Sequence, residues 1–214
     1  MNNPFVKIVA SLLIALCAIT ARAGGLESLE LFVKTVKSGK ADFTQTVTAP
    51  AKEGRSARTK TSSGTFEFSR PQRFRFDYKK PFAQSIVADG QTLWLLDVDL
   101  NQVTARKQAQ ALASSPAALI ASASDLRAVQ ADFTLTDAPD DDGQQWVSAV
   151  PKGKDSPLQS VRVGFRDGAL TTLEILDTFG QQSVMRFSAF ERNATPASAR
   201  FHFKPPPGAD VIQQ

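Results

Sequence analysis

Side chains able to carry chemistry are few in this chain. It has one His and one Cys, which argues against structural zinc, a Cys–His nucleophile and a disulfide framework. His202 alternates with Phe201 and Phe203, a pattern that predicts a surface residue on a strand. The sequence has no G-x-S-x-G elbow, and the acidic run 140–143 lacks the spacing and the closing Glu of a calcium loop, so it is expected to be a hairpin turn. These features predict a protein that is not an enzyme and has no metal or other cofactor.

Arg70 is the one polar residue whose position suggests a specific role. It has the same parity as Phe66 and Phe68, which points its side chain toward an apolar face. A guanidinium placed there needs acceptors, and uncapped carbonyls at a helix C-terminus suit its five donors. The alternative is that the strand ends before Pro71 and that Arg70 reaches solvent. Parity alone leaves both interpretations open.

The apolar side chains alternate along several segments and predict the inner face of a sheet. The chain has 15 Phe but only one Tyr and two Trp, so much of its aromatic surface has no polar handle. Alternation does not distinguish an ordinary packed core from a pocket for lipid. The predicted inner residues are Phe66, Phe68, Phe74, Phe76, Leu93, Leu95, Val161, Val163, Phe165, Leu173, Ile175, Met185 and Phe187.

The first 23 residues have the order of features of a secretory signal peptide. Lys7 precedes an apolar run too short to span a bilayer, and 21–23 read Ala-Arg-Ala, so cleavage is expected after Ala23. Cys17 follows a weak lipoprotein box, but Leu16 stands where a small residue is needed, so lipidation is not expected. The remaining residues, 24–214, are expected to form one exported domain that is monomeric.

The elements that must position these residues follow from periodicity. An amphipathic helix is expected over 25–38 and a second helical region over 109–127, with a short helix started by Ser124-Asp125. The intervening period-two segments are joined mostly by turn signals, which favours a large antiparallel sheet that curls into a barrel. The expected strands are 43–47, 64–69, 74–78, 85–88, 91–97, 101–105, 133–136, 146–150, 160–166, 170–177 and 183–190.

Composition excludes other classes of function. With 42% hydrophobic and 21% charged residues the chain is globular, and its net charge of +4 is too small and too scattered for nucleic-acid binding.

A set of short motifs in a fixed order resembles the LolA family of periplasmic outer-membrane lipoprotein carriers. Each piece is weak alone, but together they span nearly all of residues 24–214. The motifs are Ser69-Arg70-Pro71-x-x-Phe74, Val87-Ala88-Asp89-Gly90-Gln91-Thr92-Leu93-Trp94, Ser115-Pro116 with Leu119-Ile120-Ala121, Arg166-Asp167-Gly168, Asp177-x-Phe179-Gly180-Gln181 and Phe201-x-Phe203-x-Pro205-Pro206-x-Gly208.

The resemblance implies an incomplete antiparallel β-barrel of about eleven strands with an α-helical lid over an apolar cavity. It implies that Arg70 latches the lid through the backbone of Val33, Ile120 and Ala121, and that Phe74 takes part in lipoprotein transfer. It also implies three partners: acylated lipoproteins as cargo, an inner-membrane ABC transporter that loads the carrier, and an outer-membrane receptor that unloads it. Arg73 and Arg75 flank Phe74 where relatives have apolar or neutral residues, and their role is left open between docking and simple solvation.

Other functions fit the sequence less well. An outer-membrane receptor of similar fold needs a lipidated Cys, a lipid-sensing regulator needs a membrane span or second domain, and a lipid esterase needs a Ser–His–acid set. We therefore expect a periplasmic carrier that binds the acyl chains of lipoproteins.

Overall fold

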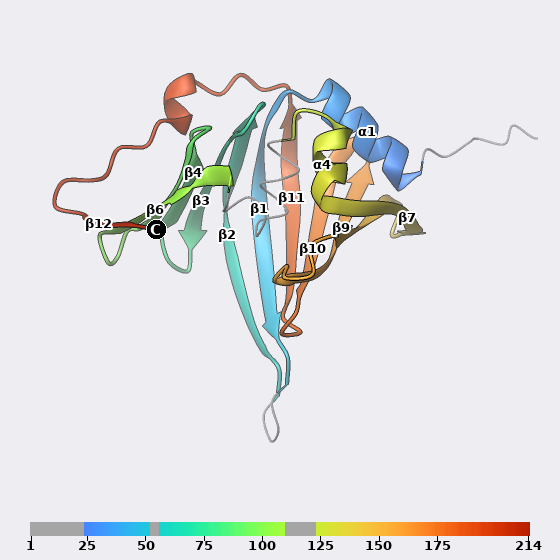
Figure 1. Ribbon diagram of the computed structural model, residues 1–214, viewed down its shortest axis with the longest axis horizontal. Helices are drawn as coiled ribbons and strands as arrows, with labels where there is room; N and C mark the ends of the chain where they lie inside the picture. Colours follow the sequence, from blue (N-terminus) through green and yellow to red (C-terminus); the bar gives the residue numbers. More distant parts are fainter. Residues whose placement is uncertain (1–23, 52–55, 110–122) are drawn as a thin grey trace, which may run out of the picture.

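The described residues form one open sheet of twelve strands with helices at one end (Figure 1). The computed structural model describes residues 24–51, 56–109 and 123–214. Neighbouring strands follow the order β12-β6-β5-β4-β3-β2-β1-β11-β10-β9-β8-β7. The strands are β1 (Ser38–Ala49), β2 (Arg58–Ser69), β3 (Arg73–Lys80), β4 (Gln84–Ala88), β5 (Thr92–Asp97), β6 (Gln102–Lys107), β7 (Phe133–Asp141), β8 (Gln144–Pro151), β9 (Leu158–Arg166), β10 (Ala169–Asp177), β11 (Gln182–Arg192) and β12 (Asp210–Gln213).

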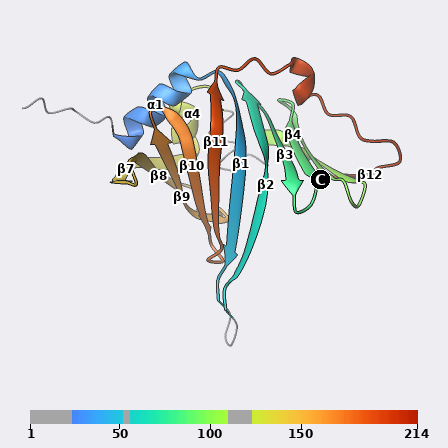
Figure 2. The same ribbon diagram turned by 180° about the vertical axis from the view of Figure 1, so that it is seen from behind.

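The sheet curls but does not close, because β12 and β7 lie at its two edges (Figures 1 and 2). This confirms the curled, largely antiparallel sheet that the alternating pattern predicts and the incomplete barrel that the family resemblance implies. Eleven of the strands match the expected segments, and the long β1–β2 hairpin extends past its neighbours. β12 was not expected, and it pairs in parallel with β6.

The C-terminal segment departs from the expected pattern. Ser198–Phe201 form a 3₁₀ helix, η1, and His202 lies outside any strand, so the strand predicted from the Phe201–Phe203 alternation is wrong. The three prolines 205–207 have no N–H to donate, which prevents a ladder there. The two rings are still used, because Phe201 is buried and Phe203 stacks on Trp94 with ring centroids 5.3 Å apart.

Helix α1 (Gly25–Thr35) covers one end of the sheet against β7, β8 and β9. It buries Leu29, Phe32 and Val33, as its apolar spacing predicts. It is shorter than expected, because Val36 is already extended and β1 begins at Ser38.

The second described helix, α4 (Leu126–Asp132), starts where the sequence predicts. The carboxylate of Asp125 accepts a hydrogen bond from the N–H of Ala128 at 3.0 Å and caps the helix. The rest of the second helical region, 110–122, lies outside the described residues.

Close packing of α1 on the sheet depends on Gly25. A Cβ at this position would overlap the carbonyl oxygen of Trp146 in β8. Alanine has the higher intrinsic helix propensity by about 1 kcal/mol, so Gly25→Ala would stabilise an unpacked helix. We expect the opposite here, a loss of about 1–3 kcal/mol in the free energy of unfolding, because α1 must move off β8.

Urea denaturation of purified residues 24–214 measures this loss. Gly153→Ala is the control, because a Cβ there meets open space, and it should stay within about 0.5 kcal/mol of wild type. Equal stability of wild type and Gly25→Ala would show that α1 does not sit this closely on the sheet.

Candidate functional site

Arg70 lies just past the end of β2, and its side chain turns inward, which is one of the two interpretations that parity leaves open. Only 9% of the residue is exposed. Its Nε donates to the carbonyl of Val36 at 2.8 Å, and its Nη1 donates to the carbonyl of Ala123. Val36 caps the C-terminus of α1, and Ala123 comes shortly before α4. One guanidinium therefore ties the end of α1 and the approach to α4 to the rim of the sheet.

Aromatic faces complete the surroundings of this guanidinium. Its carbon lies 5.6 Å from the centroid of the Phe32 ring and 5.3 Å from that of Phe68. Both distances lie within the range of a cation–π attraction. The latch, which we define as Arg70 with the carbonyls of Val36 and Ala123, thus sits directly on the apolar interior.

The latch is a charged group held at an energetic cost. Burial lowers the pKa of Arg70 to about 10, so the side chain still carries its charge at neutral pH. Nη2 has no hydrogen-bond partner among the described residues. Two charge-assisted hydrogen bonds therefore oppose the desolvation of a cation, and the net stabilisation is smaller than the bonds alone provide.

The structure changes the partners that the resemblance implies. The carbonyl of Val33 accepts from Lys37 Nζ at 3.3 Å, and Arg70 bonds Val36 instead. The physical reason is that α1 ends at Thr35, which leaves the carbonyl of Val36 free beyond the last turn. Ile120 and Ala121 lie outside the described residues.

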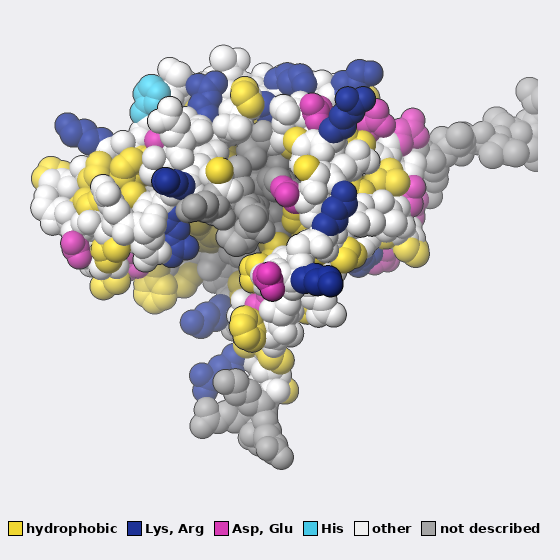
Figure 3. Space-filling view, viewed as in Figure 1, with side chains coloured by type: hydrophobic (Ala, Val, Ile, Leu, Met, Phe, Trp, Pro, Cys, Tyr) yellow, Lys and Arg dark blue, Asp and Glu magenta, His cyan; other side chains and the backbone are white. Residues whose placement is uncertain are grey.

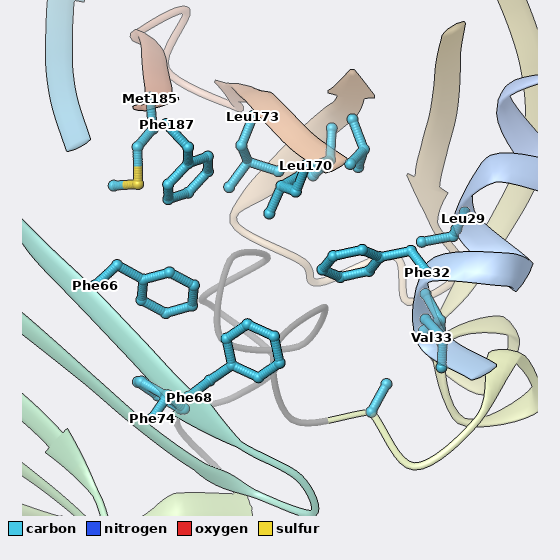
Figure 4. Close-up of a cluster of buried hydrophobic side chains, with 14 of the residues drawn as sticks. Leu29, Phe32, Val33, Phe66, Phe68, Phe74, Leu170, Leu173, Met185 and Phe187 are labelled. Atoms are coloured by element: carbon cyan, nitrogen blue, oxygen red, sulfur yellow. The ribbon is translucent and has the colours of Figure 1, made fainter. Parts of the chain in front are cut away.

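The thirteen predicted inner residues lie in one cluster. Eleven are buried, and Leu95 and Ile175 are partly buried against the same cluster. Figure 4 shows how the cluster is built: Phe66 and Phe68 point from one wall toward Leu173, Met185 and Phe187 on the other, and α1 adds Phe32. The sheet therefore brings together residues that are more than 100 positions apart in the chain.

Phe66 lies at the centre of this aromatic packing. Its ring stacks on Phe76 with centroids 4.4 Å apart and contacts Phe68 and Phe187 at 5.6 Å each. Phe74 is buried too, and its ring meets that of Phe76 edge-on at 6.0 Å.

Sequence reasoning left some cluster members out of the inner set. Phe43 on β1 is 2% exposed and joins the rings of Phe76 and Tyr78, at 5.7 and 4.9 Å. The alternation of Phe43 with Gln45 and Val47 was the available signal. Leu29 and Phe32 of α1 also belong to the cluster, and their helical spacing marked them only as apolar.

Arg73 and Arg75 hold the C-terminal segment against the face of the sheet opposite the cluster. Arg73 lies over the ring of Phe201 at 5.8 Å, and Arg75 Nη1 donates to the carbonyl of Arg200 at 3.2 Å. Arg200 in turn bonds both carboxylate oxygens of Glu67, at 3.0 and 3.1 Å. Neither arginine is simply solvated: both hold η1 on β2 and β3.

Asp77 sits between Arg75 and Arg200 in this ion network, 2.7 and 3.0 Å from their nitrogens. Burial alone would raise the pKa of Asp77, but hydrogen bonds from Arg75 and Ser85 and the charges of Arg75 and Arg200 outweigh it, so the pKa is lowered. A carboxyl whose pKa is depressed by folding adds stability above its unfolded pKa of about 3.9 and loses it as pH falls through the folded value.

We expect Asp77→Asn to lower the free energy of unfolding at pH 7 by about 1–3 kcal/mol. It should also flatten the loss of stability that wild type shows as the pH falls below about 4. Urea denaturation across this pH range measures both, with the exposed Asp140→Asn as control. A variant that loses stability with acid as steeply as wild type would contradict the role of Asp77.

No helix among the described residues has the length and apolar character needed to cross a membrane.

Comparison with known proteins identifies the family of this chain. A family model described as "Outer membrane lipoprotein carrier protein LolA" matches residues 34–204. An outer-membrane lipoprotein carrier protein of Albidiferax ferrireducens is 68% identical over 212 residues, which cover 97% of this chain and 100% of the relative. One from Leptothrix cholodnii is 54% identical over 194 residues, 91% of this chain and 88% of the relative.

Solved structures include a LolA superfamily protein, NE2245, from Nitrosomonas europaea. It matches with a TM-score of 0.48 and 13% identity over 85% of this chain and 99% of that chain. The family match covers residues 34–204, and the two carrier proteins cover 97% and 91% of this chain. This chain therefore belongs to the LolA family of outer-membrane lipoprotein carrier proteins.

Proposed function

We propose that this protein binds the acyl chains of lipoproteins released from the inner membrane and delivers them through the periplasm to the outer membrane, without catalysing a reaction. The observation that carries the proposal is the aromatic-rich apolar cluster on the inner face of the sheet, next to helices held by the buried Arg70. Membership of the carrier family supports it.

The physical need for such a carrier is large. Each CH₂ of an acyl chain exposed to water costs about 0.8 kcal/mol, so a lipoprotein with several chains cannot cross an aqueous compartment alone. The inner face offers alkyl chains a surface of Phe, Leu, Val and Met side chains. Met185 is flexible and the Phe rings are large. When these side chains move apart, they can therefore pack against an acyl chain.

The Arg70 latch makes the binding of acyl chains reversible. In the closed form the two hydrogen bonds of Arg70 favour α1 and the approach to α4 near the sheet rim. A bound chain must separate these parts, and the burial of the chain offsets the loss of the two bonds. By linkage, whatever favours the closed form weakens lipid binding by the same free energy, so the latch keeps the affinity modest.

The remaining parts of the proposal concern the route. Residues 1–23 serve as a signal peptide cleaved after Ala23, an inner-membrane ABC transporter loads the carrier, and an outer-membrane receptor accepts the cargo. Phe74 acts in the transfer step. N-terminal mass spectrometry of the native protein separates this carrier from a membrane-anchored receptor, because the carrier begins with a free Gly24 and the receptor with a diacylated Cys17.

The direct test is uptake of cargo. Inner-membrane vesicles that hold a radiolabelled triacylated lipoprotein are incubated with purified residues 24–214 and the loading transporter. We expect the lipoprotein to appear in the supernatant as a complex with the protein. The same lipoprotein without its acylated Cys is the control for binding to the polypeptide part. Failure to remove any acylated protein from the vesicles would exclude the proposed function.

A further inference from the structure

An exposed apolar patch lies at the end of the sheet away from α1. Phe82 in the β3–β4 turn is 70% exposed, and Leu100 and Val98 in the β5–β6 turn are 71% and 49% exposed. The two turns are joined, because the N–H of Val98 donates to the carbonyl of Ala83 at 3.2 Å. Single exposed apolar residues are ordinary, but three on two bonded turns form a continuous patch.

Basic residues surround this patch. Lys79 and Lys80 come immediately before the β3–β4 turn, and Lys60 and Arg58 lie on the neighbouring end of β2; all four are exposed. Figure 3 shows apolar and basic side chains together on this part of the surface.

A pocket of about 800 Å³ lies beside the patch, and Lys60, Phe82 and Leu100 are among the residues that line it. The acidic residues there are Asp97, whose carboxylate accepts from the N–H of Leu100 at 3.0 Å, and Asp99. Among the described residues at this end, Arg58, Lys60, Lys79 and Lys80 outnumber Asp97 and Asp99, so these six side chains together carry a net positive charge.

We propose that this patch is a docking surface for an anionic phospholipid membrane. Apolar side chains at the tips of turns can enter the headgroup region while surrounding Lys and Arg contact the phosphates. Each cation close to an anionic surface raises the binding constant about fivefold, so binding is reversible and depends on salt. A protein partner fits less well, because Lys is depleted at the cores of protein interfaces.

The proposal goes beyond the carriage of lipoproteins. Docking would place the β3–β4 and β5–β6 turns and the 800 Å³ pocket beside them against the bilayer, and leave the Arg70 latch at the other end of β3 facing away from it. It does not depend on cargo, because the patch, its charges and its test involve no lipoprotein.

The test uses lipid-stripped residues 24–214 and sucrose-loaded vesicles in a sedimentation assay at low salt. Vesicles of phosphatidylglycerol and phosphatidylcholine in equal parts are compared with vesicles of phosphatidylcholine alone. We expect binding to the anionic vesicles that is at least about tenfold stronger and that falls as salt is added. Phe82→Ser/Leu100→Ser and Lys79→Gln/Lys80→Gln should each lower this binding by about tenfold or more.

Matched controls lie elsewhere on the surface. Phe179→Ser removes a ring that is 82% exposed on the separate β10–β11 turn, and Lys34→Gln/Lys40→Gln removes two exposed cations from α1 and β1. Both should bind within about twofold of wild type. Circular dichroism confirms that each variant is folded.

Three results would overturn the proposal: no binding of wild type to anionic vesicles, equal binding to neutral vesicles, or equal losses in patch and control variants. If wild type ignores vesicles while Phe82→Ser/Leu100→Ser slows transfer to a purified receptor, the patch serves a protein partner instead.

Discussion

Arg70→Leu is expected to load lipoprotein as wild type does but to release it about tenfold to a hundredfold more slowly. The substitution removes the two hydrogen bonds to Val36 and Ala123, so the closed form loses its main polar tie. Each bond from a charged donor is worth about 1.5–3 kcal/mol. The cost of burying the cation, reflected in its pKa of about 10, offsets part of that sum. The net free energy by which the two bonds favour the closed form is lost in Arg70→Leu, and the variant therefore binds lipid more tightly by that amount.

Release is measured as the rate at which labelled lipoprotein moves from the preloaded carrier to vesicles that hold the receptor. Arg70→Lys should fall between wild type and Arg70→Leu, because an ammonium keeps the charge but not the fork that spans two carbonyls. Arg166→Leu, a surface change on β9, is the matched control and should release like wild type. Wild-type release by Arg70→Leu would reject the latch.

Phe66→Ala is expected to lower the free energy of unfolding by about 3–5 kcal/mol. The ring is 1% exposed and packs against Phe68, Phe76 and Phe187, so truncation removes apolar burial and leaves a void in the middle of the cluster. Urea denaturation of the lipid-free protein measures the loss.

A saturating acylated lipopeptide should restore more stability to this variant than to wild type, because an alkyl chain can fill the space that the ring vacates. Phe179→Ala controls for loss of a ring at an exposed site and should change stability by less than about 0.5 kcal/mol. A loss at Phe66 as small as the loss at Phe179 would mean that the aromatic cluster does not form a continuous interior.

Local patterns predicted most of the sheet. Period-two alternation of Phe66, Phe68, Phe74 and Phe76 marks strands with one buried face, and Gly- or Asp-containing turns mark where they reverse. Both signals lie within a few residues of each strand. The β1–β2 pairing is that of a hairpin between consecutive strands. The pairing of β1 with the distant β11 depends on how the whole open sheet assembles, and no local signal indicates it.

The site was partly predictable for the same reason. Parity is compatible with an inward Arg70 but does not exclude one that reaches solvent. Its acceptors depend on where α1 stops, and Val36 in place of Val33 is a difference of nearly one turn. The end of the helix is set by competition with β1, which starts at Ser38 to pair with Ser69. That competition depends on the tertiary structure, and no local sequence pattern indicates it.

The C-terminal segment was the least predictable part. β12 has four exposed residues, too short and too polar for a strand signal, and it exists because the edge of β6 offers free backbone groups. The ion network that holds η1 joins Glu67, Asp77 and Arg200. When charged residues alternate with apolar rings along a strand, the sequence predicts that the charged face is solvated. Only the position of the C-terminal segment shows that this face is covered.

The central claim, that an acyl chain enters the aromatic cluster, has a direct probe in Met185. It is the only Met in residues 24–214 and is 5% exposed within the cluster, so labelling with ¹³C-methyl methionine gives one NMR signal from the interior. Titration with a triacylated lipopeptide whose acyl chain ends in a nitroxide should shift this signal and broaden it beyond detection, and ascorbate reduction should restore it. A Met185 signal that stays sharp and unshifted while the lipopeptide binds to saturation would place the chains outside the cluster.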